Sequence, residues 1–281
     1  MTDLPGGFGA HVANIGIKDD TPDFVVVASD RPVPAVGLFT RSRFAGPSVV
    51  LSRAHLADGH AQAIVVVSKN SNVATGPQGD DDAVELAQLV AERIGCDVTD
   101  VVVTSTGVIG RTYPMDRVRA GAAAVPDRPS AVAAEPAAAG MMTTDTHPKV
   151  AAASVGGSGA RVVGLAKGVG MIEPDMATHI SLVFTDAQVG QADLDAVFRR
   201  VVDRTFNSVS IDTDTSTSDS SVIMASGHAG PVDLSELEDA LDEVCLDLTK
   251  QIARDGEGAN SLLEVRVDGA RDAAQAKRVA K

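Results

Sequence analysis

Short apolar runs rich in β-branched residues recur along the whole chain, and each has the length of a single strand. Several of them, such as FVVV and IVVV, are continuous rather than alternating, which indicates strands that are mostly buried. The predicted strands cover residues 23–30, 63–70, 100–107, 178–186, 220–227 and 262–269.

Three other segments show the spacing of an amphipathic helix. The first follows the acidic GDDDA run, which suits a helix N-terminus, and the third opens with a Ser235-x-x-Glu238 pattern that predicts a capping box. The predicted apolar stripes comprise Val84, Ala87, Val90 and Ile94, then Leu194, Val197, Phe198, Val201 and Val202, then Leu237, Leu241, Val244, Leu248 and Ile252. Because strands and helices mix throughout, the pattern predicts a layered α/β or α+β domain.

The stretch from Gly121 to Gly140 departs from this pattern. It is dominated by alanine, but Pro126, Pro129 and Pro136 interrupt any helix. We expect a solvent-exposed excursion with broken helical pieces rather than a domain boundary, since candidate site residues lie on both sides of it.

The composition is that of a folded, acidic protein. Of 281 residues, 44% are hydrophobic and 22% charged, and 24 Lys and Arg against 38 Asp and Glu give a net charge of −14. This charge repels phosphate backbones and lipid heads, and 3% of aromatic residues offers little for base stacking, so we expect neither nucleic-acid nor membrane partners. Two cysteines, no apolar N-terminal stretch and no run of about 18 apolar residues predict a reduced, cytoplasmic setting.

Several common site patterns are missing from the sequence. The six histidines include no HExxH spacing, so no metal site is predicted, and no GxxxxGK[ST] loop for nucleotides is present. The Asp212-x-Asp214 pair could hold magnesium in a phosphatase, but the surrounding hydroxyls equally suit a turn that hydrogen-bonds its own backbone.

Two threonine-containing segments remain as candidates for catalysis. In KGVGMIEPDMATHISLVFTD, residues 167–186, a glycine-rich loop and a proline lead to Thr178 at the start of a predicted strand. A threonine hydroxyl is a weak nucleophile, and cutting the chain before it frees an α-amine with a pKa of about 7.7–8.0 that can take its proton. At another strand end, Thr106 and Gly107 could present a hydroxyl and a backbone N–H to an oxyanion. Each segment alone is equally compatible with an ordinary strand end.

Seven ordered motifs identify the sequence as similar to the ornithine acetyltransferase (ArgJ) family. They are GLFTRSRFAGPSVV (37–50), KNSNVATG (69–76), TSTGVIGRTYPMD (104–116), MMTTDTHPK (141–149), AKGVGMIEPDMAT (166–178), TFNSVSIDTDTSTSD (205–219) and DGEGA (255–259). The resemblance implies an α+β fold of four layers, α/β/β/α, of the self-cleaving type. It also implies cleavage of the Ala177–Thr178 bond into an α chain of residues 1–177 and a β chain of residues 178–281, assembled as a heterotetramer of two chains of each kind.

The same resemblance assigns roles to single residues. It implies Thr178 as the nucleophile, Thr106 and Gly107 as the oxyanion hole, and Thr143, Lys167, Thr178 and Glu257 as substrate contacts. The expected function is that of a glutamate N-acetyltransferase of arginine biosynthesis: Thr178 takes the acetyl group of N-acetylornithine, and glutamate then accepts it, with no cofactor and no metal.

Two departures from the family pattern bear on this function. KNSNVATG stands where arginine-pathway members usually read NSGNANACTG, and it looks more like the homologue of clavulanic-acid clusters. The family also continues beyond the GARDAAQAKRVAK ending, so that a chain ending there lacks the family's C-terminal domain. The alternatives are an N-terminal-nucleophile aminopeptidase or amidase, in which water resolves the acyl-enzyme, and a truncated, inactive homologue that acts as a binding protein.

Overall fold

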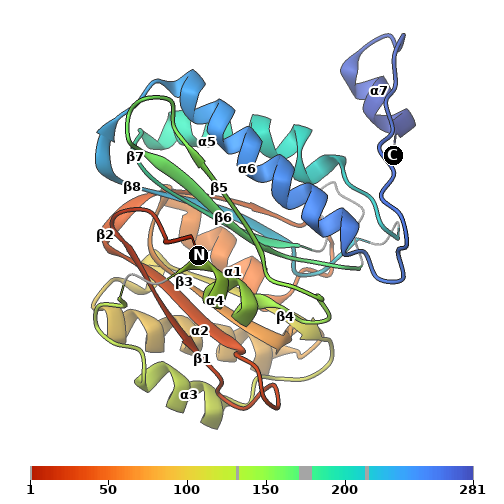
Figure 1. Cartoon of the computed structure of the whole chain (residues 1–281). Helices are drawn as coiled ribbons and strands as arrows, with labels where there is room; N and C mark the ends of the chain where they lie inside the picture. The colour runs from red at the N-terminus through yellow and green to blue at the C-terminus, as the bar shows by residue number, and fades with distance from the viewer. Residues whose placement is uncertain (1, 131–132, 171–178, 213–214, 281) are drawn as a thin grey trace.

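The computed structural model describes residues 2–130, 133–170, 179–212 and 215–280, in which strands and helices alternate along the chain (Figure 1). The strands are β1 (Phe8–Ala13), β2 (Phe24–Phe39), β3 (His60–Asn70), β4 (Val101–Val108), β5 (Lys149–Ser154), β6 (Arg161–Lys167), β7 (Ile180–Gln188) and β8 (Ser220–Pro231). The helices are α1 (Pro47–His55), α2 (Pro77–Ile94), α3 (Met115–Ala123), α4 (Ala134–Met141), α5 (Gln191–Arg204), α6 (Leu234–Arg254) and α7 (Ala273–Ala280), with short 3-10 turns η1 (Leu56–Asp58), η2 (Val98–Asp100) and η3 (Phe206–Ser208).

Strand β2 organises the sheet. It is 16 residues long, and its first part pairs with β1 and β3 while its last part pairs with β8. The register shifts between Ala28 and Val33, close to Pro32 and Pro34, which cannot donate to a regular ladder. The strand order is β4-β3-β2-β8-β7-β6-β5, with β1 against β2. The irregularity divides this sheet into two halves that pack face to face.

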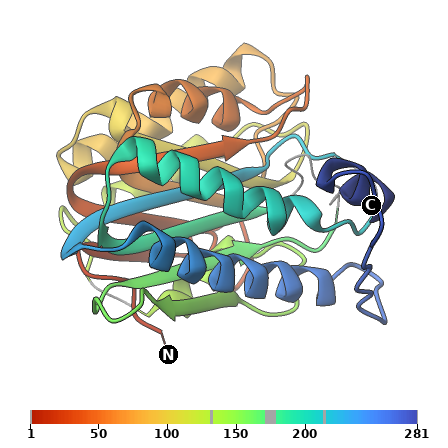
Figure 2. The same cartoon turned by 90° about the horizontal axis from the view of Figure 1, so that it is seen from above.

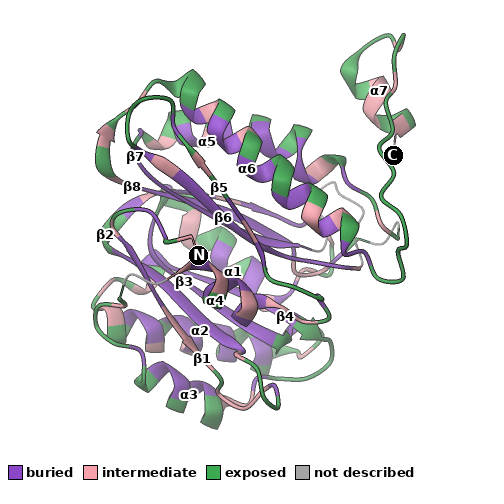
Figure 3. Cartoon of the chain, in the orientation of Figure 1, coloured by how far each residue is buried: buried purple, intermediate pink, exposed green. Residues whose placement is uncertain are grey.

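The two halves give four layers (Figures 1 and 2). Side chains from both halves, among them Val66, Leu165 and Phe184, share one core between the halves. Helices α2 and α3 cover the outer face of the β2–β4 half, and α5 and α6 cover the outer face of the β5–β8 half. Figure 3 shows buried strands between helices whose outer faces are exposed. The predicted α/β/β/α arrangement is therefore confirmed.

This layering explains the continuous apolar runs. In β3, Ile64 and Val66 enter the core between the halves, while Val65 and Val67 enter the core beneath α2. Covered strands need apolar residues on both faces, so alternation disappears. Five predicted strands are confirmed as β2, β3, β4, β7 and β8, but the sixth is wrong. Residues 262–269 pair with no described strand, and Leu263 is 83% exposed.

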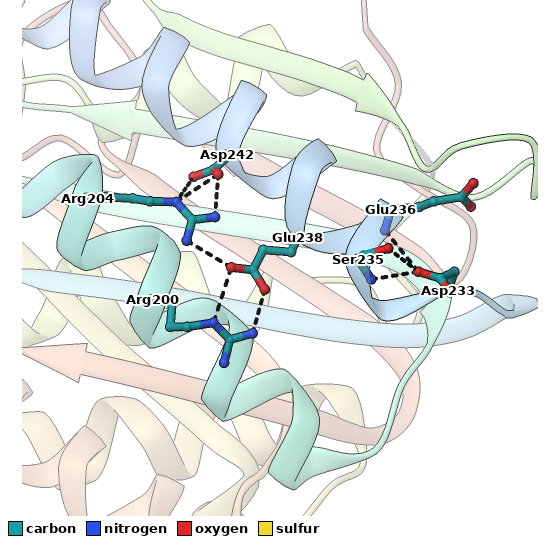
Figure 4. Close-up of polar contacts among 7 residues, drawn as sticks. All are labelled: Arg200, Arg204, Asp233, Ser235, Glu236, Glu238 and Asp242. Carbon is teal, nitrogen blue, oxygen red and sulfur yellow. Dashed lines mark hydrogen bonds and ion pairs between the residues drawn. The ribbon is translucent and has the colours of Figure 1, made fainter.

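The helix predictions hold for position, but the predicted capping box is wrong. Helices α2, α5 and α6 occupy the three predicted segments. In α6, Asp233 rather than Ser235 is the N-cap, and its carboxylate accepts hydrogen bonds from the first backbone N–H groups of the helix. Glu238 instead forms ion pairs with Arg200 and Arg204 of α5 (Figure 4). Asp233, two residues before the predicted cap, accepts the hydrogen bonds of the free N–H groups at the start of α6. Glu238 is therefore available for the ion pairs between α5 and α6.

The apolar stripe of α2 also differs from the prediction. Val84 is 38% exposed and Ile94 is half-buried, whereas Ala83, Leu86 and Ala91 are buried. The helix packs on both β4 and α3, so alanines on its flanks become part of the core.

The alanine-rich stretch is buried at α4, contrary to the predicted solvent-exposed excursion. Ala134, Ala137, Ala138 and Met141 are fully buried in the core between the two halves of the sheet. Pro136 lies in the first turn of the helix, where its missing N–H breaks no helical hydrogen bond. The small side chains let the helix approach strands of both halves closely.

The cysteines and the long helices bear on the expected reduced setting and on the expected absence of a membrane span. Cys96 and Cys245 are free cysteines. In the ranges that the structure describes, no helix has both the length and the apolar character needed to cross a bilayer.

The adjacent methionines 141 and 142 test the placement of α4. Met141 is fully buried, whereas Met142 lies just after the helix and is partly exposed. We expect Met141→Ala to lower the free energy of unfolding by about 2–5 kcal/mol, and Met142→Ala by less than about 1 kcal/mol. Urea denaturation of both variants measures this. Equal, small effects would contradict the buried position of α4.

Candidate functional site

A cavity of about 710 Å³ opens where β3, β4 and β6 end. Its size is typical of sites that bind small molecules. Loops after β1, α4, β6 and α6 complete its wall. The lining residues include Lys18, Asp19, Asp20, Thr21, Lys69, Thr106, Gly107, Thr143, Lys167, Gly170, Asp212 and Glu257.

The predicted site residues that the structure describes all line this cavity, although they lie on distant parts of the chain. They are Thr106 and Gly107 near the end of β4, Thr143 after α4, Lys167 at the end of β6 and Glu257 after α6. Ala177 and Thr178 lie outside the described residues. The described chain resumes at residue 179, and Ile180 pairs with Lys167 in the antiparallel β6–β7 ladder. The chain therefore enters β7 directly beside Lys167.

Backbone geometry requires glycine at position 107. Gly107 has a φ of 129°, and a Cβ atom there would lie 2.2 Å from the carbonyl carbon of Lys69. The two residues are in register in the parallel β3–β4 pair. Close approach of the two strand ends thus places the Gly107 backbone beside the Thr106 hydroxyl on the cavity wall.

Lys167 is buried and contacts the predicted oxyanion hole. Its Nζ donates a hydrogen bond of 3.2 Å to the Thr106 Oγ1. Burial lowers the pKa of Lys167, while Asp145 and Asp219 oppose that shift. Because an ammonium group only donates, the Thr106 oxygen is the acceptor here, and its own O–H can donate to a second group. The lysine therefore orients and polarises a hydroxyl at the strand end.

A buried ion-pair network lies behind the cavity wall. The Lys149 Nζ, which is fully buried, lies 2.8 Å from Asp145 Oδ1 and 2.6 Å from Asp255 Oδ2. Burial would raise the pKa of Asp145, but Lys167 and Lys149 hold it below its usual value. The pKa of Asp255 is likewise held low by Lys149 and Thr146 against the effect of burial. The positive charges of Lys149 and Lys167 therefore compensate the negative charges of Asp145 and Asp255, and all four residues are buried.

The network fixes the loops that carry the candidate residues. Asp145 accepts hydrogen bonds from the backbone N–H groups of Thr143, at 3.0 Å, and of Gly168, at 2.7 Å. Asp255 accepts from the backbone N–H of Thr146 at 3.0 Å. The Glu257 N–H, two residues after Asp255, donates to the Val169 carbonyl at 2.6 Å. One buried lysine thereby connects the segments of Thr143, Lys167 and Glu257.

Sequence reasoning did not identify Lys18, Lys69, Lys149 and their aspartate partners. Lys69 has a left-handed backbone with φ of 70°, unusual for a strand residue, and its Nζ lies 3.5 Å from Asp19. A signal was available for Lys69, because the carboxyl ends of neighbouring parallel strands meet at one edge of a sheet. Lys149 carries no such signal, because one of its partners, Asp145, lies four residues before it, whereas the other, Asp255, lies 106 residues after it.

Across the described ranges, no three His, Cys, Asp or Glu side chains are grouped as ligands. Asp212 lies at the cavity, next to Gly170, whereas Asp214 is outside the described residues.

Comparisons with known proteins place the chain among relatives of one kind. The model of the ArgJ family matches residues 9–281. An arginine biosynthesis bifunctional protein ArgJ 2 of Nostoc sp. is 53% identical over 277 residues, which are 99% of this chain and 71% of that protein. The glutamate N-acetyltransferase Oat2 of Streptomyces clavuligerus is 52% identical over 278 residues, 99% of this chain and 70% of that protein. The expected similarity to this family and to a clavulanic-acid-type homologue is confirmed.

A solved structure agrees with this family relationship. The crystal structure of ornithine acetyltransferase from Mycobacterium tuberculosis, complexed with ornithine, is 34% identical with a TM-score of 0.57. The match covers 60% of this chain and 92% of that chain. The matched chain is therefore shorter than this one, whereas the curated relatives are longer.

Removing the Lys149 ammonium tests the network. We expect Lys149→Met to lower the free energy of unfolding by about 3–5 kcal/mol near pH 7, because it leaves two buried carboxylates without their cation. In the wild type, low pKa values of Asp145 and Asp255 give stability above their unfolded-state pKa near about 4, and this stability is lost as pH falls through the folded values. Protonated carboxyls need no partner, so the difference between variant and wild type should shrink on acidification. Urea denaturation at several pH values measures it, and a difference that does not depend on pH would contradict the ion-pair account.

Proposed function

The chain belongs to the ArgJ family, and on this premise we propose that it is a glutamate N-acetyltransferase that moves the acetyl group of N-acetylornithine to glutamate. One observation carries the proposal. Four segments, which carry Thr106 with Gly107, Thr143, Lys167 and Glu257, bring hydroxyls, a glycine backbone, an ammonium and a carboxylate to one cavity of small-molecule size. These are the groups that an acyl transfer between amino acids needs.

We propose that the β4 end stabilises the oxyanion of the reaction. The tetrahedral oxygen would accept hydrogen bonds from the Gly107 N–H and from the Thr106 hydroxyl. The contact of Lys167 Nζ with Thr106 Oγ1 supports this role, since it leaves the hydroxyl proton for the oxyanion and places a positive charge nearby. Removing one such donor typically costs about 100- to 1,000-fold in rate.

The nucleophile of the proposed reaction is Thr178. Its hydroxyl attacks the acetyl carbonyl, a C–O ester bond forms, and the C–N bond of N-acetylornithine breaks. The hydroxyl proton passes through the α-amine of Thr178 to the leaving amine, which departs as ornithine. The amine of glutamate then attacks the ester, and the proton returns to Thr178. Thr143, Lys167 and Glu257 would hold the α-carboxylate and amine groups of both amino acids. No cofactor takes part in either step.

The proposal includes maturation into two chains. We propose an α chain of residues 1–177 and a β chain of residues 178–281, which assemble as a cytoplasmic heterotetramer of two chains of each kind. The short chain of the matched ornithine acetyltransferase structure supports a division of this kind, since the curated relatives are longer than this chain. The cut frees the α-amine that the nucleophile needs.

Hydrolysis is the competing outcome at the same acyl-enzyme. In an aminopeptidase or amidase of this architecture, water would attack the acyl-enzyme and acetate would be released. An inactive binding protein would release neither acetate nor N-acetylglutamate. Measuring N-acetylglutamate and acetate in one assay separates the three functions. We expect N-acetylglutamate to be the main product.

We expect the purified protein to consist of two pieces of about 18 and about 11 kDa, divided between residues 177 and 178 of the 28.8 kDa chain. Thr178→Ala lacks the hydroxyl for the N-to-O acyl shift and should remain one chain, while Thr178→Ser should still be cut. Intact-mass spectrometry measures the pieces. A Thr178→Ala variant that is still divided at this bond would exclude self-cleavage by Thr178.

We expect initial rates with varied N-acetylornithine and glutamate to give parallel double-reciprocal lines. The first product leaves before the second substrate binds, because the acetyl group stays on the enzyme between the two steps. Ornithine should also inhibit competitively against glutamate, since both react with the acyl-enzyme. Lines that intersect would show a ternary complex instead and would contradict the acyl-enzyme scheme.

A further inference from the structure

In the proposed function, on which this inference rests, one site must accept two substrates whose side chains carry opposite charges. Ornithine carries a cationic side chain, whereas glutamate carries an anionic one, and both must react at the same acyl group. A cavity with charge of one sign would favour one of them strongly. The cavity described above is lined by groups of both signs.

Two lysines lie on the side of the cavity formed by β3 and the loop after β1. Lys69 is the second-last residue of β3 and pairs with Gly107 of β4. Neighbouring strands of a sheet lie about 4.8 Å apart. Lys69 therefore lies beside the proposed oxyanion hole and lines the same cavity. Its Nζ lies 3.5 Å from Asp19, which is 93% exposed and easily replaced by another carboxylate.

Lys18 lines the same cavity and is more deeply buried than Lys69, whose side chain is 47% exposed. It is 8% exposed, and its Nζ donates to the Pro22 carbonyl at 2.7 Å. Burial lowers the pKa of Lys18 to about 8, Asp23 opposes this shift, and Lys167 and Lys69 add to it. Lys18 thus lies within electrostatic reach of both Lys69 and Lys167, and an anion bound near Lys18 would relieve this repulsion.

The carboxylates lie around the loop after β6. A Cβ atom at Gly170 would be 3.1 Å from Glu257 Oε2 and 3.5 Å from Asp212 Oδ2, so both carboxylates adjoin this glycine. Both residues line the cavity together with Lys18 and Lys69. Asp19 and Asp20 add negative charge only on the exposed loop, at the mouth of the lysine side.

We propose that Lys69, supported by Lys18, binds the side-chain carboxylate of the acyl acceptor and selects an anionic amino acid over a cationic one. The acceptor's carboxylate replaces Asp19 as the partner of Lys69. The cationic side chain of the donor is directed instead to Glu257 and Asp212. One acyl site thereby serves two substrates of opposite side-chain charge, through the lysines near the end of β3 and the carboxylates beside Gly170.

The left-handed backbone of Lys69 supports a dedicated role. A φ of 70° in a residue other than glycine, asparagine or aspartate costs free energy, and such positions are concentrated at functional sites. The pairing with Gly107 holds this conformation. Methionine is unbranched like lysine and has the same four-atom stem without the ammonium group, so that Lys69→Met removes the charge and leaves most of the apolar side chain.

The experiment compares acceptors on the same acyl-enzyme. Protein acetylated with N-acetylornithine is mixed with glutamate or with ornithine, and kcat/KM is measured for each acceptor in wild type, Lys69→Met, Lys69→Arg and Lys69→Glu. Lys250→Met, an exposed lysine of α6 outside the cavity, is the matched control. We expect the ratio of glutamate to ornithine to fall about tenfold in Lys69→Met, equivalent to about 1.4 kcal/mol, to fall further in Lys69→Glu, and to recover in Lys69→Arg.

The outcomes separate this inference from the proposed function. A Lys69→Met enzyme that transfers acetyl with the wild-type ratio of acceptors would overturn the role of Lys69 while leaving the acetyltransferase in place. Equal losses with both acceptors would overturn it as well, because they indicate general damage to the cavity. A wild-type protein that forms no acyl-enzyme would overturn the proposed function and this inference together.

Discussion

A single buried ammonium group, that of Lys149, joins three of the segments that form the cavity, those of Thr143, Lys167 and Glu257. Its two partners, Asp145 and Asp255, lie 110 positions apart and hold the backbone of Thr143, Thr146 and Gly168. Charges removed from water must be matched closely, and here every carboxylate also accepts backbone hydrogen bonds. The geometry around Lys167 is therefore set by a polar network rather than by apolar packing.

The sheet provides the second constraint, because it brings strand ends together at the cavity. Parallel pairing of β3 with β4 places Lys69 beside Gly107, and antiparallel pairing of β6 with β7 places Lys167 beside Ile180. Both pairs lie at ends of strands whose other residues are covered by helices on one face and by the opposite half on the other. A rigid core thus carries polar strand ends at a cavity, which is the usual arrangement for binding sites.

Local sequence patterns predict many of the strands and helices, but they do not predict how the sheet divides into two halves that pack face to face. Runs of β-branched residues predicted β2, β3, β4, β7 and β8, whereas β1, β5 and the buried β6 were missed. The second part of β2 was also missed, and it contains Pro32 and Pro34, which argue against a strand. Those prolines mark the irregularity at which the sheet divides. The segment containing Leu263 has the pattern of a strand but lies exposed, since pattern alone supplies no neighbour to pair with. Likewise, Thr106, Lys167 and Glu257 could be named from motifs, while Lys149 depends on contacts between distant segments. The roles of the named residues remain predictions.

The most direct test of the account locates the acetyl group on the protein. The protein is incubated with N-acetylornithine in the absence of glutamate, quenched in acid and digested, and the peptides are analysed by tandem mass spectrometry. We predict one acetyl group on the peptide that begins with Thr178, which disappears when glutamate is added before the quench. Release of ornithine with no acetylated Thr178, or acetylation of another side chain that glutamate removes, would contradict the central claim that this cavity transfers acetyl through an N-terminal threonine.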